Sequence, residues 1–384
     1  MKLSSAQIRG FFEGDGGIQV RVDKRKNGLS FRSQAKFGQK TKNTQILEWC
    51  KESLQTNVTM AEYEETTSSW FTFAFNSNVG FIQIYLENKP VNPGTYKDFL
   101  IALLIYGYQI QRYIPFSAET ASLLQEKPYM ECERMEFLTL LWLRFQRPAT
   151  RETRTIHTIE HYYEHVNATP NEISSAERLG NELLIPISMK VNSLVSDLEN
   201  DNIQISDQIS EDFVAYYHVA DGSLSFNFHK RRLARNRQNI KIEPVWSITD
   251  DLLAEPLLKR IGRQYNFSDY QSLRNQNSGY IRARGWAKAK EVVIPFFKGK
   301  QSRLPDVIAN KVTNFIEVCE FHFNENTFKN AKLYRSYVRK AYFCNPDSGK
   351  HTEEKFERDY KELMETIISD RQMLRSEFVN FSSP

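Results

Sequence analysis

Residues 8–16 read Ile-Arg-Gly-Phe-Phe-Glu-Gly-Asp-Gly, and residues 214–222 read Val-Ala-Tyr-Tyr-His-Val-Ala-Asp-Gly. Each stretch is an apolar helical segment that ends in Asp-Gly, and residues suited to a helix N-cap precede both. A glycine after the last helical residue is a frequent stop signal, so each segment is predicted to be a helix with an aspartate, Asp15 or Asp221, at its tip. A theme that occurs twice predicts two related halves in one chain.

The sequence after each motif predicts a hairpin, because apolar and polar residues alternate there as a half-buried strand requires. The predicted elements are strands at residues 18–23, 29–38, 57–65 and 69–76 with a helix at 41–55, and strands at 224–229, 240–248 and 279–284 with a helix at 250–263. The order helix, hairpin, helix, hairpin, helix therefore occurs twice. This order predicts an α+β fold of two pseudo-symmetric half-domains, each an antiparallel sheet with helices on one face.

The sheet face without helices is predicted to carry polar and basic side chains at every second position. These candidate DNA-binding residues are Gln19, Arg21, Asp23, Arg25, Ser30, Arg32, Gln34 and Lys36 in the first half, and Ser225, Asn227, His229, Arg231, Lys241, Glu243, Ser247, Arg282 and Arg284 in the second. Such side chains suit the base edges of a DNA major groove, which admits a two-stranded ribbon. An ordinary solvated sheet face is the alternative interpretation, and the two Asp-Gly helices favour DNA binding over it.

Composition narrows the class of protein further. The 384 residues are 40% hydrophobic, which suffices for the cores of two domains, and no apolar run is long enough to cross a bilayer. The first residues lack the pattern of a secretory signal or transit peptide, so the protein is expected to act in the compartment where it is made. Four cysteines, Cys50, Cys132, Cys319 and Cys344, lie far apart, which argues against a zinc site and a disulfide framework.

The basic residues are clustered, although the formal net charge is only +4. Residues 21–42 contain eight Lys or Arg against one acid, residues 229–242 contain six against none, and residues 282–303 contain seven against one. Local basic surfaces beside a nearly balanced total indicate a polyanionic partner that is bound at defined places.

The paired helices resemble the LAGLIDADG motif, and the elements after each copy resemble the half-domain of the LAGLIDADG homing endonucleases of the double-motif, single-chain type. The resemblance implies that each half has a curved antiparallel sheet that binds DNA. It divides the chain into an N-terminal half-domain at 1–145, a long helical linker at 146–205, a C-terminal half-domain at 206–345 and a helical C-terminal extension at 346–384.

The resemblance also implies a metal-dependent DNA endonuclease. Phosphodiester hydrolysis needs a metal ion to generate hydroxide and stabilise the leaving oxygen, and oxygen ligands suit Mg²⁺ or Mn²⁺. Asp15 and Asp221 are therefore the expected metal ligands. The family's polar residue that orders the attacking water matches Gln39 in the first half and Asp250 in the second, with Thr249 as the alternative if the register shifts by one residue.

Further positions of the family's pattern are matched less completely. Lys300 is the candidate for the lysine that polarises water, and Lys89 is the best candidate in the first half. Glu13 is expected on a helix face or in a cap. In this family the two motif helices pack closely through small residues such as Gly10, and Tyr216 at the matching place in the second helix puts that close approach in doubt.

Two functions remain open. The first is an endonuclease encoded by an intron or a similar mobile element, which cuts both strands of a long double-stranded DNA target; retention of both motif acids favours it. The second is a group I intron RNA maturase, or another non-catalytic nucleic-acid-binding protein on the same fold, and the degenerate second motif favours that function. The protein is expected to be a monomer without a membrane partner. Its expected location is the mitochondrion or chloroplast if it is organelle-encoded, and the cytoplasm otherwise.

Overall fold

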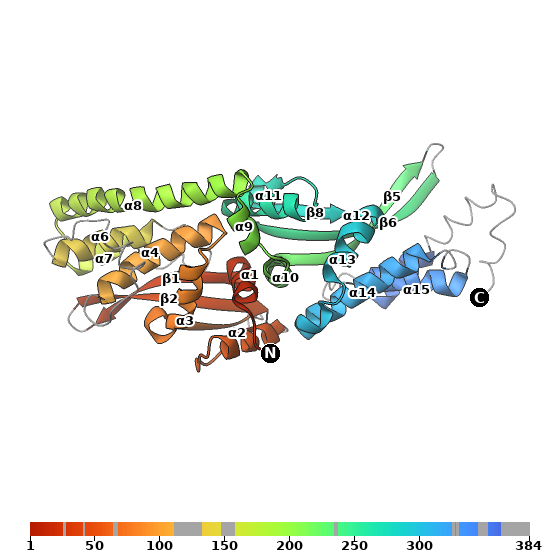
Figure 1. Ribbon diagram of the computed structural model, residues 1–384, viewed down its shortest axis with the longest axis horizontal. Coiled ribbons are helices and arrows are strands. Elements are labelled where there is room, and N and C mark those ends of the chain that lie inside the picture. The colour runs from red at the N-terminus through yellow and green to blue at the C-terminus, as the bar shows by residue number, and fades with distance from the viewer. Residues whose placement is uncertain are drawn as a thin grey trace. The chain divides into compact units, whose positions relative to one another are not determined.

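The chain forms two units that repeat one sheet topology. The computed structural model describes residues 1–25, 28–40, 43–63, 68–110, 133–146, 158–233, 237–324, 327, 330–344 and 352–361. The compact units are Met1–Phe213 and Val214–Pro384. Each has a four-stranded antiparallel sheet, with the order β1-β2-β4-β3 in the first and β5-β6-β8-β7 in the second (Figure 1). The predicted α+β fold of two related halves is confirmed, and the four-part division of the sequence stays a prediction.

In the first unit the motif helix leads directly into the hairpin, as predicted. The elements in chain order are α1 (Ser5–Asp15), β1 (Gly16–Arg25), β2 (Gly28–Lys40), α2 (Thr44–Ser53), β3 (Ala61–Tyr63), β4 (Ser68–Ala74), η2 (Phe75–Ser77), α3 (Val79–Glu87), α4 (Pro93–Ile110), α6 (Glu133–Phe145), α7 (Ile159–His165), α8 (Pro170–Glu199) and α9 (Ile203–Gln208).

The second motif helix, α10 (Glu211–Asp221), is followed by the same order of strands. The elements are β5 (Gly222–Leu233), β6 (Arg237–Asp251), η4 (Leu252–Ala254), α11 (Glu255–Gln264), β7 (Gln271–Leu273), η5 (Arg274–Gln276), β8 (Ser278–Arg284), α12 (Trp286–Lys288), the π-helical turn η6 (Ala289–Val293), α13 (Ile294–Phe297), η7 (Gln301–Arg303), α14 (Asp306–Phe323) and α15 (Ala331–Tyr342).

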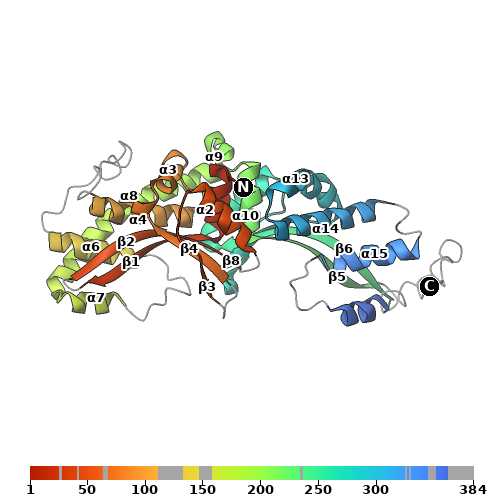
Figure 2. The ribbon, with the colours of Figure 1, turned by 90° about the horizontal axis from the view of Figure 1, so that it is seen from below.

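One face of the first sheet is covered by helices α1, α2 and α4 (Figure 2). The alternating apolar residues of the hairpin point to this side, and aromatic rings dominate the core. The ring of Phe37 lies 4.8 Å from that of Phe12 and 4.9 Å from that of Phe71, measured between centroids. Because burial of one phenylalanine contributes about 1.5–3 kcal/mol, these rings fix the motif helix on the strands that follow it. Ser33 Oγ, also on the covered face, donates to the Ala102 carbonyl at 2.9 Å.

The core of the second unit centres on Trp246 of β6, which is fully buried. Its ring lies 4.3 Å from that of Phe267 and 4.9 Å from that of Phe297. Its Nε1 donates to Nδ1 of His218, a buried residue of the motif helix, at 3.1 Å. Burial, with a smaller contribution from the charge of Lys311, lowers the pKa of His218 to about 3, so the ring is neutral and can accept this hydrogen bond.

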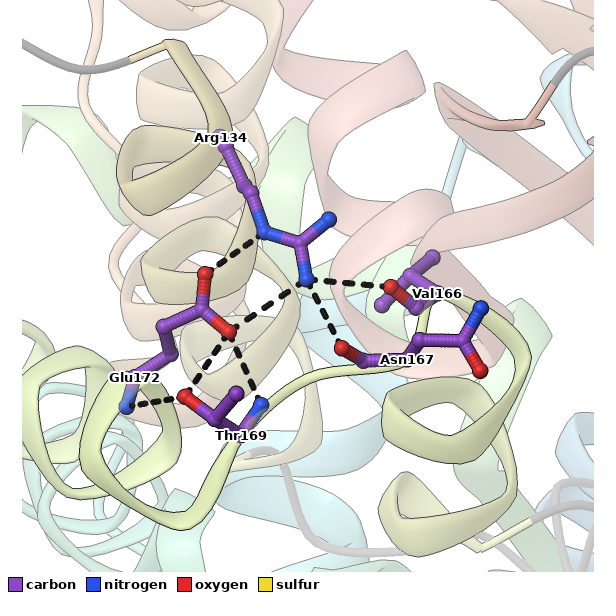
Figure 3. A network of polar contacts seen from close by, with 5 residues as sticks. All are labelled: Arg134, Val166, Asn167, Thr169 and Glu172. Atoms are coloured by element: carbon purple, nitrogen blue, oxygen red, sulfur yellow. Dashed lines mark hydrogen bonds and ion pairs between the residues drawn. The ribbon is translucent and has the colours of Figure 1, made fainter.

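Helix α8 packs against α6 and α4 and is therefore part of the first unit. Thr169 and Glu172 form a capping box at its start. Arg134 of α6 donates through Nε to Glu172 Oε1 at 2.6 Å and through one terminal nitrogen to the carbonyls of Val166 and Asn167 at 3.1 and 2.9 Å (Figure 3). The hydrogen bond from Arg134 is the main reason that the pKa of Glu172 is lowered to about 2. The polar network thus fixes the start of α8 to α6.

The cysteines that the structure describes are free thiols, and its described helices do not have the character of membrane spans. Cys50, Cys319 and Cys344 are buried free thiols, whereas Cys132 lies outside the described residues. None of the described helices is long and apolar enough to span a membrane.

Candidate active site

Each unit places its motif aspartate where the motif helix meets the sheet. Helix α1 ends at Asp15, and Gly16 is already extended, with φ −86° and ψ 169°. A Cβ on Gly16 would lie 2.3 Å from Phe12 Cδ2, and one on Gly222 would lie 1.7 Å from His218 Nδ1. Glycine is therefore needed because the chain folds back onto the preceding helical turn, and not because it adopts a left-handed conformation.

Asp15 lies against Gln39, the residue that the resemblance assigns to the ordering of water. Gln39 Nε2 donates to Asp15 Oδ2 at 2.9 Å, and Gln39 Oε1 accepts from the backbone N–H of Lys40 at 2.8 Å, which orients the amide. Although Asp15 is an exposed residue, the loss of water around its carboxylate raises the pKa of this group. The positive charge of Lys40 and the Gln39 hydrogen bond act in the opposite direction. Lys40 was not anticipated from the sequence, although its place directly after Gln39 was a usable signal.

The donor set at Asp15 suits a hard divalent cation. The carboxylate stands at the C-terminal end of α1, where the helix dipole favours positive charge. Among the described residues, no three or more His, Cys, Asp or Glu side chains are grouped so that they could hold a metal ion. Mg²⁺ is commonly held by one or two carboxylates, with water and substrate phosphate as the other ligands. The residues present therefore fit a metal whose coordination is completed by the substrate.

Strand register identifies the second unit's counterpart of Gln39. In the first sheet the glycine after the motif pairs with Phe37, and in the second sheet the corresponding glycine pairs with Ile248. Gln39 and Asp250 each lie two residues beyond that partner. Asp250 is thus the structural counterpart, and the alternative Thr249 lies on the opposite face of the strand.

The surroundings of Asp250 differ from those of Gln39. The hydroxyl of Tyr217 donates to Asp250 Oδ2, and the backbone N–H of Asp251 donates to Asp250 Oδ1 at 2.6 Å. Tyr217 lies one helical turn before Asp221, at the position that Phe11 has in the first unit. A phenol and a carboxylate therefore replace the phenylalanine ring and the Gln39 amide of the first unit. Sequence reasoning did not foresee Tyr217. The two centres therefore have different polar groups behind their aspartates.

The two candidate lysines make contacts of different kinds. Lys300 Nζ donates to the Phe296 carbonyl and lies 4.6 Å from the centroid of the Phe296 ring. Lys89 Nζ lies 3.4 Å from Asp197 Oδ2, which ties the loop after α3 to the end of α8. In the first unit, Lys40 is the lysine whose charge acts on the motif aspartate.

Glu13 is a buried residue whose carboxylate accepts hydrogen bonds from backbone N–H groups. These groups belong to the loop before α4 and not to the helix of Glu13 itself. Its Oε2 accepts from the backbone N–H groups of Val91 and Asn92, both at 2.8 Å, and its Oε1 lies 3.5 Å from Arg9 Nε. Burial raises the pKa of Glu13 to about 7 against the lowering effects of Arg9 and the two N–H groups. Arg9 also donates to the carbonyl of Lys89 at 3.0 Å. The pair therefore fixes the motif helix to the loop before α4.

The close approach expected at Gly10 is made to Phe213, which lies near the start of the second motif helix α10 and is the last residue of the first unit. A Cβ on Gly10 would lie 2.1 Å from the Phe213 carbonyl oxygen. Tyr216, at the matching place in the second motif helix, is buried in the second unit, and its hydroxyl donates to the carbonyl of Arg303.

The uncovered face of the first sheet holds the predicted polar residues in register. Gln19 pairs with Gln34, Arg21 with Arg32 and Asp23 with Ser30, while Lys36 follows on the same face toward Asp15. Two cations are held by neighbours there. Arg32 Nη2 lies 3.2 Å from Asp23 Oδ2, and Lys36 Nζ lies 5.2 Å from the centroid of the Trp70 ring.

The uncovered face of the second sheet has comparable contacts. Register places Ser225, Asn227, Glu243, Ser247, Arg282 and Arg284 on this face. Arg284 Nε lies 2.5 Å from Glu243 Oε2, and the Arg282 guanidinium carbon lies 3.8 Å from the centroid of the Tyr280 ring. The side chains of Arg25, Ser30, His229, Arg231 and Lys241 lie outside the described part of the structure.

Comparison with known proteins identifies the class of fold. Residues 8–106 match the family model described as LAGLIDADG endonuclease. Similar solved structures include a mutant of I-SmaMI, with 12% identity, a TM-score of 0.60 and coverage of 90% of this chain and 98% of that one. The LAGLIDADG homing endonuclease I-GzeII in complex with its DNA target has 10% identity, a TM-score of 0.57 and coverage of 88% and 97%. The LAGLIDADG homing endonuclease I-LtrWI bound to target DNA has 10% identity, a TM-score of 0.57 and coverage of 88% of this chain and 96% of that one. No curated protein sequence matches at a significant level.

At these identities the likeness to solved structures shows the fold alone, and that fold is the two-domain LAGLIDADG architecture. The match of residues 8–106 adds the family's sequence pattern for the first half. The predicted resemblance to LAGLIDADG homing endonucleases of the double-motif, single-chain type is therefore confirmed.

Proposed function

We propose that the protein is a site-specific DNA endonuclease that hydrolyses both strands of a long duplex target with Mg²⁺ or Mn²⁺. The observation that carries the proposal is the Asp15 carboxylate, which is held by Gln39 at the end of the motif helix, next to a sheet face of polar and basic side chains. Similar solved structures include I-SmaMI bound to cleaved DNA and to an uncleaved target in the presence of calcium.

Asp15 and Asp221 would hold the metal, which supplies a Lewis acid for the phosphate and lowers the pKa of bound water. Gln39 holds the Asp15 carboxylate through a 2.9 Å hydrogen bond from its Nε2. Lys40, whose positive charge acts on Asp15, would stabilise the negative charge that develops on the phosphate during hydrolysis. The sheet residues bind the duplex and present one phosphodiester to each centre.

The test compares Asp15→Asn and Asp221→Asn with the unchanged protein on supercoiled plasmid that carries the intronless allele of the host gene. Each variant should lose Mg²⁺-dependent cleavage but bind the target within about tenfold of the unchanged protein, because the sheet surface is untouched. Glu87→Gln, a charge change on the exposed side of α3, is the matched control and should cleave normally. Near-normal cleavage by either aspartate variant would overturn the assignment.

A group I intron maturase is the second candidate, and one observation favours it. Asp250, unlike Gln39, is held by a tyrosine hydroxyl, and RNA binding would tolerate a second centre that is altered in this way. Binding of the host intron RNA with accelerated splicing, without cleavage of the intronless allele, would support this function. Endonuclease and maturase activities in one protein would show both effects.

We further propose that the protein is intron-encoded and acts as a monomer. The two-unit chain supports the monomeric state, since one polypeptide carries both motif aspartates. Its compartment would be the mitochondrion or chloroplast if the host gene is organellar, and the cytoplasm otherwise. Sedimentation at several protein concentrations tests the oligomeric state, and mapping of the coding sequence to an intron tests the origin.

A further inference from the structure

The uncovered faces of the two sheets carry the same order of held cations. Nearest the motif aspartate of the first unit, Lys36 lies over the ring of Trp70. Arg32 lies four residues before Lys36 in β2, roughly 13 Å away at 3.3 Å per residue, and is ion-paired with Asp23. The aromatic contact is thus near the catalytic end of the sheet, and the carboxylate contact is distant from it.

The second sheet repeats this order with different residues. Tyr280 pairs with Thr249, the residue before Asp250, just as Trp70 in the first sheet pairs with the residue before Gln39. Arg282 lies over the Tyr280 ring, and two residues further along β8 its neighbour Arg284 is ion-paired with Glu243. We name Lys36 and Arg282 the aromatic-held cations, and Arg32 and Arg284 the carboxylate-held arginines.

The two kinds of partner have different electrostatic consequences. An aromatic ring orders a cation but leaves its charge unchanged. A carboxylate also orders the guanidinium, but the pair has no net charge and attracts phosphate less. Sequence-independent affinity for DNA comes from neutralising phosphates, whereas base identity is read by geometric hydrogen bonds such as those from arginine to guanine.

We propose that Asp23 and Glu243 are positioning residues that confine the carboxylate-held arginines to reading base identity. Each acid cancels the long-range attraction of its arginine for phosphate and pre-orders the guanidinium, so that less side-chain entropy is lost when it meets a base. Lys36 and Arg282, which lie over aromatic rings, bind the phosphate backbone at any sequence, close to the cleavage centres. This inference rests on the proposed DNA binding.

The experiment measures affinity for two probes at several salt concentrations. One probe is the duplex recovered by the unchanged protein from a random library, and the other is a scrambled duplex of equal length. Asp23→Asn should bind the scrambled duplex about threefold more tightly with a salt slope steeper by about 0.9, and its preference for the selected duplex should fall about tenfold. Lys36→Met should weaken both probes alike and leave the preference unchanged.

Two controls separate positioning from a general charge effect. Glu87→Gln removes one negative charge from α3 and should alter neither the preference nor the salt slope appreciably. Arg32→Ala should lower the preference at least as much as Asp23→Asn, and the double variant should equal Arg32→Ala, since the acid acts only through the arginine. An unchanged preference in Asp23→Asn, or additive effects in the double variant, would overturn the inference.

The second unit provides an independent repetition. Glu243→Gln and Arg284→Ala should show the same relation, but at base pairs in the other half of the selected duplex. If one variant does not fold, as judged by circular dichroism, the pair in the other unit decides. Failure of the unchanged protein to select any sequence would overturn the proposed function itself, an outcome distinct from selection that survives removal of both acids.

Discussion

Gly10→Ala should destabilise the first unit, although alanine is the better helix former. The added Cβ would lie 2.1 Å from the carbonyl oxygen, 2.9 Å from the carbonyl carbon and 3.1 Å from the Cα of Phe213. A carbon and a carbonyl oxygen make contact at about 3.3–3.6 Å, so the methyl group overlaps the oxygen by roughly 1.2–1.5 Å. All three atoms belong to the backbone, so the clash cannot be relieved by a change of rotamer.

The size of the effect follows from two opposing terms. Replacing a glycine inside a helix by alanine ordinarily contributes about 0.5–1 kcal/mol of stability. Overpacking costs about 1–3 kcal/mol where side chains can shift, and the upper end applies here because the backbone must move. The net loss of unfolding free energy is therefore expected to be about 2 kcal/mol.

The measurement is the denaturant midpoint and the melting temperature of Gly10→Ala beside those of Gly17→Ala. A Cβ on Gly17 meets nothing within 4 Å, so this control should be as stable as the unchanged protein or slightly more stable. A Gly10→Ala variant that matches or exceeds the stability of the Gly17→Ala control would refute the close backbone contact.

Three further predictions concern pH, catalysis and the second motif. Burial lowers the pKa of His218 to about 3 from 6.5, so between these values the unfolded state binds a proton that the folded state does not; the unfolding free energy should fall as the pH falls, by up to about 1.4 kcal/mol per unit. His218→Asn should flatten this slope in denaturation measured from pH 6.5 to 5, whereas His165→Asn, at an exposed position, should not. Lys40→Met and Lys300→Met should each slow one strand by about 10²-fold or more, so that nicked plasmid accumulates, with the opposite strand affected in each variant; equal slowing of both strands would remove the catalytic assignment. Gly222→Ala should lower the melting temperature, because its Cβ would lie 2.6 Å from the His218 carbonyl oxygen; an unchanged melting temperature would contradict that geometry.

Part of the candidate site could be predicted from rules that act between residues close in the chain. Asp15 and Asp221 end apolar helical segments, and the glycine after each is needed for the tight turn into a strand. Gln39 and Asp250 were predicted from the resemblance to the family, and the strand register of the structure places both at equivalent positions. The helix ends and the glycines after them depend on periodicity and on sterics between residues close in the chain, which a single sequence contains.

The sequence could not predict which side chains contact one another across strands or between distant segments. The sequence contained Lys89 and Lys40 alike, but only the fold shows that Lys89 is paired with Asp197 while Lys40 acts on Asp15. Tyr217 was likewise unremarkable until packing brought its hydroxyl to Asp250.

By itself, the sequence determined two half-domains of one topology, their motif aspartates and the alternation that gives each sheet a polar face. Only the tertiary structure decided which cation on that face is held by an acid and which by an aromatic ring. The physical reason is that alternation along a strand selects the face of the sheet, whereas the neighbour of Arg32 or Arg284 depends on the register between strands, which the whole core must select.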